Sequence, residues 1–116
     1  MTFNFHNKQF RLLRNDGPGA EVTVETTFYF TQRTEAGREI VEAAYSGGGV
    51  LWGRLIGVLE GDRMRHAYVQ VNHDGKFSSG ESTDEISLLP NGKMQLIDRW
   101  QWKTREGEGV CIFEEI

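Results

Sequence analysis

The sequence has few of the residues that form disulfides or bind metals. Its 116 residues include one cysteine, Cys111, so the chain cannot form an internal disulfide, and a single thiol fits a reducing compartment. The histidines His6, His66 and His73 are far apart in the chain, and none forms a pair with the spacing typical of metal ligands. We therefore expect no metal site and no cofactor.

The chain also lacks a long apolar run and an excess of basic residues. Its most apolar stretch, residues 50–59, contains Arg54 and is too short for a membrane helix, which needs about 20 residues. Residues 1–16 lack the uninterrupted apolar segment of a signal peptide. The formal net charge of −4 argues against non-specific binding of nucleic acid. We expect a cytoplasmic protein with no membrane or nucleic-acid partner.

Proline is scarce, at 2 residues, whereas glycine is abundant, at 14, so the turns depend on glycine. Alternating apolar and polar residues, broken by turn signals such as Asp74-Gly75 and Asn91-Gly92, indicate β-strands. The predicted strands cover residues 9–14, 21–31, 38–45, 50–59, 63–71, 76–89, 93–102 and 110–115. By propensity residues 38–45 could form a short helix, but their flanking glycines and short length favour a strand.

Eight consecutive strands with short connections predict a single all-β domain over residues 1–116. A meander of this length usually closes on itself, because closure removes the exposed edges of the sheet. The predicted fold is an up-and-down antiparallel β-barrel, and the alternative is a β-sandwich.

The predicted strand over residues 50–59 is apolar on both faces. One face carries Val50, Trp52, Ile56 and Val58, and the other carries Leu51, Leu55 and Leu59. A strand that is apolar on both faces is covered on both faces. We expect the barrel core to cover one face and a second subunit the other, which predicts a homodimer or a larger assembly. We assign the three leucines to the subunit-facing side.

This assignment turns Trp52 and Arg54 into the barrel, where other aromatic and polar residues join them. The candidate ligand-binding residues are Trp52, Arg54, His66, Tyr68, Asp98, Trp100 and Trp102. Asp98 is the one charged residue on the inner face of its predicted strand, so we expect Arg54 to pair with it. The inverse assignment, in which Arg54 reaches solvent, remains open.

The residues support two classes of function. Aromatic side chains in a small barrel can hold a small apolar or anionic ligand, or they can fill a solid core in a structural or interaction protein. An enzyme is less favoured, because no nucleophile or acid–base pattern is present. Residues 48–53 have the spacing of a phosphate loop, but Arg54 and Leu55 follow where lysine and serine or threonine are needed. Asp84 and Glu85 are adjacent on a predicted strand, so they point to opposite faces and we interpret them as surface charge.

Four short motifs make the chain resemble a family of short uncharacterised bacterial proteins. The motifs are YSGGG at residues 45–49, GRLIG at 53–57, VNHDG at 71–75 and WQW at 100–102. The resemblance covers most of the chain after Phe28 and implies no chemistry. Members are sometimes labelled N-acetylglutamate synthase, but residues 105–109 lack the spacing of an acetyl-CoA loop. As a fold analogy, the predicted barrel resembles avidins and lipocalins.

Overall fold

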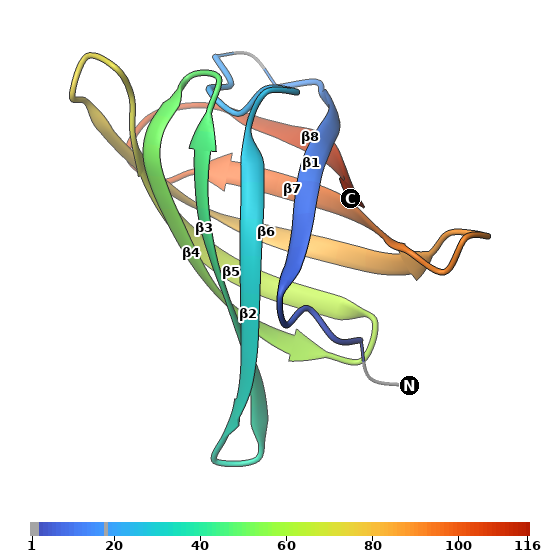
Figure 1. The fold of residues 1–116 in the computed structure, drawn as a ribbon. Coiled ribbons are helices and arrows are strands. Elements are labelled where there is room, and N and C mark those ends of the chain that lie inside the picture. Colours follow the sequence, from blue (N-terminus) through green and yellow to red (C-terminus); the bar gives the residue numbers. More distant parts are fainter. Residues whose placement is uncertain (1–2, 18) are drawn as a thin grey trace.

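The computed structural model describes residues 3–17 and 19–116, which form a closed eight-stranded antiparallel barrel (Figure 1). The strands are β1 (Lys8–Asn15), β2 (Thr27–Glu35), β3 (Arg38–Gly47), β4 (Val50–Glu60), β5 (Arg63–Val71), β6 (Phe77–Leu88), β7 (Met94–Trp102) and β8 (Glu108–Glu115). Each strand pairs with the next, and β8 pairs with β1. The predicted up-and-down barrel is confirmed, and β3 is a strand rather than a helix. Among the described residues, no helix is long and apolar enough to cross a membrane.

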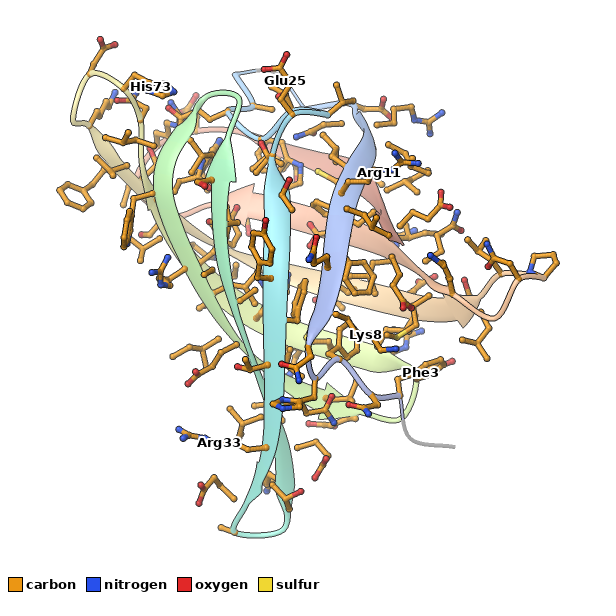
Figure 2. The ribbon with its side chains drawn as sticks, in the orientation of Figure 1. Phe3, Lys8, Arg11, Glu25, Arg33 and His73 are labelled. Carbon is orange, nitrogen blue, oxygen red and sulfur yellow. The ribbon has the colours of Figure 1, made fainter. Side chains whose placement is uncertain are left out.

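Antiparallel connection places alternate loops at opposite ends of the barrel. The β1–β2, β3–β4, β5–β6 and β7–β8 connections share one end, which we call the mouth. Figure 2 shows Glu25 and His73 at this end and Arg33 at the other. These four loops therefore control access to the interior from the mouth.

Phenylalanines fill the interior toward the opposite end of the barrel. Phe5, Phe10 and Phe30 are all buried, and their ring centroids lie 5.1 to 5.6 Å apart. Fully burying a large apolar side chain stabilises the fold by about 1.5–3 kcal/mol. This packing closes that end of the lumen, so the space that remains lies closer to the mouth.

The loop between β1 and β2 is longer than the sequence predicts. The predicted strand over residues 21–31 is wrong at its start, since β2 begins at Thr27 and continues to Glu35. Residues 20–26 instead belong to the loop at the mouth, and their backbone is bonded to the β3–β4 turn. The amide of Gly49 donates to the carbonyl of Glu21 at 2.8 Å, and the hydroxyl of Thr26 donates to the carbonyl of Gly47 at 2.9 Å.

Close approach of this loop explains the glycine triplet at residues 47–49. A Cβ atom on Gly48 would lie 2.2 Å from Oγ1 of Thr23, and one on Gly49 would lie 2.7 Å from the carbonyl oxygen of Glu21. Gly48 also has a φ of +62°, which side chains other than glycine rarely adopt. The triplet therefore forms both the turn between β3 and β4 and the surface on which the β1–β2 loop rests.

Strand β4 is apolar on both faces, as predicted, but the assignment of its faces is wrong. Leu55 and Leu59 are buried in the barrel, whereas Trp52 and Ile56 are 61% and 58% exposed on the outer surface. Of the three leucines expected to face a second subunit, Leu51 alone is exposed. The exposed apolar side chains of β4 are therefore chiefly tryptophan and isoleucine, with this one leucine.

Candidate functional site

A cavity lies in the lumen between the phenylalanine cluster and the mouth. Aromatic rings of Tyr45, Tyr68, Trp100 and Trp102 form part of its wall, and polar side chains of β5, β6 and β7 form another part. Its volume of about 60 Å³ is enough for about four water molecules. An apolar cavity that takes up benzene has a volume of about 150 Å³. This space holds a few water molecules, and because the cavity is only partly enclosed, a ring compound would extend beyond it.

Three ionisable side chains meet at the polar wall of the cavity, one from each of three neighbouring strands. His66 lies on β5, Asp84 on β6 and Asp98 on β7, and the backbones of the two aspartates are directly paired. Nε2 of His66 lies 2.9 Å from Oδ2 of Asp98 and 3.3 Å from Oδ2 of Asp84. All three side chains are buried. We call this cluster the His66–Asp84–Asp98 trio.

Burial and mutual charge set the protonation of the trio. Burial by itself lowers the pKa of His66, but the charges and hydrogen bonds of Asp84 and Asp98 outweigh it and raise the pKa to about 10. Burial and the charge of Asp98 raise the pKa of Asp84 well above its usual value. Burial opposes ionisation of Asp98 too, yet hydrogen bonds from Asp84 and His66 hold its pKa below the usual value. The environment of the trio therefore favours the protonated forms of His66 and Asp84 and the ionised form of Asp98.

The trio also has the donor atoms of a cation site. One nitrogen and two carboxylate oxygens lie within 4.8 Å of one another. With a neutral imidazole and two carboxylates, the trio would carry a charge of −2, which one divalent cation would balance. Imidazole and carboxylate groups are ligands for zinc and related ions. These three residues could hold such an ion, although the sequence led us to expect no metal site.

Several polar atoms around the cavity have no hydrogen-bond partner among the described residues. They are Nδ1 of His66, Oγ of Ser82, Oδ1 of Asp84 and Nε1 of Trp102. Buried polar groups in folded proteins nearly always have a partner, and leaving one unpaired costs about 1–3 kcal/mol. By contrast, Nε1 of Trp100 donates to Oδ1 of Asn15 at 3.2 Å. The residues that line the cavity therefore carry buried donors and acceptors that no described group satisfies.

Five of the seven predicted site residues line the cavity: His66, Tyr68, Asp98, Trp100 and Trp102. The prediction that Trp52 and Arg54 point into the lumen is wrong. The guanidinium of Arg54 lies outside, 4.6 Å from the centroid of the Trp52 ring, and donates to the carbonyl of Gly53 at 2.8 Å. Because Asp98 bonds to His66 inside the barrel, the predicted pair between Arg54 and Asp98 is also wrong.

Sequence reasoning missed Asp84, which we interpreted as surface charge and which is 1% exposed. Its neighbour Glu85 is exposed, as strand alternation requires. The alternation along β6 is the signal that could have found Asp84. Ser82, Asp84 and Ile86 alternate with exposed residues, and all three are buried. An aspartate in phase with an inward isoleucine indicates an inward carboxylate.

Replacing Arg54 with methionine should leave stability nearly unchanged. The side chain lies on the surface and contacts an exposed ring, and an exposed cation–π contact contributes about 0.5–1 kcal/mol at most. Part of this is retained through packing of the methionine on Trp52. Denaturant unfolding of Arg54→Met and the wild type should give free energies within about 1 kcal/mol. A loss of several kcal/mol would mean that the guanidinium is buried.

A family model described as avidin-like protein matches residues 3–116. No curated protein and no solved structure matches the chain. The family match covers all eight strands of the barrel as well as the residues that line the cavity.

Proposed function

Because this chain belongs to the avidin-like protein family, we propose that its barrel binds a small molecule in the lumen. The fold by itself does not specify a ligand, since one architecture can serve unrelated functions. The observation that carries the proposal is the set of unpartnered polar atoms around the cavity, above all Nε1 of Trp102 and Nδ1 of His66. A solid core would place apolar groups at these positions or pair them with each other.

The chemistry of the cavity wall favours a neutral, flat ligand with both a donor and an acceptor. The N–H groups of Trp102 and His66 can donate to a carbonyl oxygen, while Oδ1 of Asp84 can accept from an N–H group. His66 is already paired with Asp98 and Asp84, so a charged head group would be buried without a free counter-charge. Tyr68 and Trp102, whose rings lie 5.7 Å apart, would pack against the flat part of the ligand. A cyclic amide has these properties.

The test compares three six-membered ring compounds that differ in hydrogen-bonding groups. δ-Valerolactam has a donor and an acceptor, cyclohexanone has an acceptor alone, and cyclohexane has neither. Binding would be followed by tryptophan fluorescence in a Trp52→Phe variant, in which the signal comes from Trp100 and Trp102. We expect affinity to fall from the lactam to the ketone to the hydrocarbon. Equal affinity for all three, or no saturable response to any, would overturn the proposal.

We also propose that a second copy of the chain covers the outer face of β4 and β5. Support comes from exposed apolar side chains on neighbouring strands, where Trp52, Ile56 and Val69 are all exposed. Phe77, at the start of β6, is 70% exposed beside them and pairs with Val71. These apolar side chains surround Arg54 on the outer face, and clustered exposed apolar side chains on a monomer often mark a site of association. This surface replaces the leucines as the proposed contact between subunits.

Replacing Ile56 with aspartate should dissociate such an assembly while leaving the barrel folded. Burying one isoleucine contributes about 1.5–3 kcal/mol, and the substitution also places a charge in the contact on each subunit. Sedimentation velocity at micromolar concentration would measure the change. Leu88→Asp is the matched control, because Leu88 is exposed at the opposite end of β6 from Phe77. A wild type that sediments as a monomer would contradict the proposal.

A further inference from the structure

The donor atoms of the His66–Asp84–Asp98 trio are spaced like the ligands of a metal ion. Nε2 of His66 lies 2.9 Å from Oδ2 of Asp98 and 3.3 Å from Oδ2 of Asp84. Two ligands that each lie about 2.0–2.1 Å from one ion are separated by about 2.8–3.4 Å in octahedral or tetrahedral geometry. Both distances in the trio fall within this range, so an ion needs no rearrangement of the three side chains.

Strands rather than loops hold the three side chains in place. The trio has one member on each of β5, β6 and β7, which are neighbours in the barrel (Figure 1). Gly57 on β4 leaves room for the histidine, because a Cβ atom there would lie 3.0 Å from Cβ of His66. Side chains on paired strands are positioned more precisely than side chains on loops. The site is therefore formed by the barrel itself.

The two carboxylates lie out of water and close together. The exposed fraction of the side chain is 2% for Asp84 and 6% for Asp98, and their backbones are directly paired. Buried charges in proteins are paired with other charges or coordinate metals, and two carboxylates that share a site repel each other when both are ionised. A divalent cation between Asp84 and Asp98 would replace this repulsion with attraction to both.

A fourth polar side chain next to the trio also lacks a partner. Ser82 is paired with His66 across β5 and β6, and it shares the inner face of β6 with Asp84. It is 5% exposed and lines the cavity, yet its Oγ forms no hydrogen bond with any group in the described part of the chain. Buried hydroxyl groups nearly always have a partner. A water molecule bound to an ion at the trio would provide one.

The kind of donor indicates the kind of ion. Ca²⁺ and Mg²⁺ take six or more ligands, nearly all of them oxygen, whereas the trio supplies one nitrogen and two oxygens. Imidazole together with carboxylate is typical of Zn²⁺ and the neighbouring first-row ions, and a site with three protein ligands keeps a further position for water. The adjoining cavity has room for that water.

We propose that the trio binds one divalent first-row transition ion through Nε2 of His66 and one carboxylate oxygen each of Asp84 and Asp98. Water in the cavity completes the coordination and hydrogen-bonds to Ser82, and the ion ties β5, β6 and β7 together. This site does not depend on the proposed lumen binding, because Nδ1 of His66 and Oδ1 of Asp84 are not needed by the ion. The sequence contains no metal motif, since each ligand comes from a different strand.

Titration with the metal alone tests the site. The purified chain, dialysed against EDTA, would be titrated with Co²⁺ and then with Zn²⁺. We expect Co²⁺ to give a saturable visible absorption band at one equivalent, and Zn²⁺ to abolish that band and raise the Tm, because an ion that binds the folded state stabilises it. Mg²⁺ at the same concentration should do neither. Absence of a saturable band together with an unchanged Tm would overturn the proposal.

Matched variants assign the ion to the trio. Asp84→Asn keeps the shape of the side chain but removes a charged ligand, so it should weaken Co²⁺ binding by more than about tenfold, since even an outer-shell partner typically contributes that much. Glu85→Gln is the control, because Glu85 is the exposed neighbour on the same strand, and its affinity should be unchanged. Asp98→Asn provides a second ligand variant if Asp84→Asn does not fold. Equal affinity in the ligand variant and in Glu85→Gln would overturn the proposal.

The exposed histidines provide the last control. His6 and His73 lie on the surface and could bind added metal weakly. The double variant His6→Gln, His73→Gln should bind Co²⁺ as tightly as the wild type, with the same visible band. Loss of the band in this double variant would place the ion on the surface and overturn the proposal.

Discussion

Replacing His66 with leucine is expected to lower the free energy of unfolding by about 3–5 kcal/mol, the usual result of removing one partner from a buried ion pair. His66 is the cation of the trio, and its Nε2 lies 2.9 Å from the carboxylate of Asp98. Without it, two buried carboxyl groups face each other across β6 and β7 with no positive charge between them. Denaturant unfolding of His66→Leu and the wild type would measure the loss.

The triple variant His66→Leu, Asp84→Val, Asp98→Val is the matched control. Replacing a complete buried ionic cluster with apolar residues is often neutral or even stabilising, because the cost of removing the charges from water is no longer incurred. We therefore expect the triple variant to recover most of the stability that the single variant loses. If the triple variant is as unstable as His66→Leu, packing rather than charge explains the loss. The triple variant should also lose affinity for δ-valerolactam.

The free energy of unfolding is expected to fall as the pH rises from about 6.5 to about 10. The pKa of His66 is raised in the folded state, so its contribution is fully present below pH 6.5 and is lost as the pH rises through about 10. Asp84 acts in the same direction, because its raised pKa means that the folded state holds a proton that the unfolded state releases. Asp98 has a lowered pKa and acts at acidic pH, where its contribution is lost as the pH falls.

The slope of stability against pH measures this linkage. Each proton that the folded state holds in excess contributes at most about 1.4 kcal/mol per pH unit. Denaturant unfolding between pH 6.5 and 10 would give the slope, with the triple variant as the control for all other titrating groups. We expect a clear fall for the wild type and a much flatter profile for the triple variant. Parallel profiles would mean that the trio does not hold the extra protons.

The sequence predicted the barrel because strand alternation and glycine turns are local signals. It could not predict which face of β4 points inward, since both faces are apolar and periodicity alone cannot choose between them. The choice depends on glycines that face the lumen. A Cβ on Gly53 would lie 2.3 Å from the ring of Tyr45, and one on Gly57 would lie 3.0 Å from Cβ of His66. Glycine therefore occupies the inner positions of β4 where Tyr45 and His66 need the space. These are tertiary contacts, which periodicity along the strand does not reveal.

The candidate site could be predicted in part. The inward phase of β7 identified Asp98, Trp100 and Trp102, but the trio and the loop at the mouth depend on contacts distant in sequence. Apolar and polar residues alternate through Val22 and Val24, although residues 20–26 form no strand. Val22 is apolar because it packs against the core from the loop. The loop is bonded to the β3–β4 turn instead of a strand partner, and no local pattern indicates this.

The indole N–H signals in a proton–nitrogen NMR spectrum test lumen binding most directly. Each tryptophan reports a different environment, since Trp52 is exposed outside, Trp100 is bonded to Asn15, and Trp102 has an unpartnered Nε1 at the cavity. On titration with δ-valerolactam we expect the Trp102 signal to shift in a saturable way while the Trp52 signal stays in place. A Trp102 signal that does not move, or that shifts no more than Trp52, would contradict binding of this ligand class in the lumen.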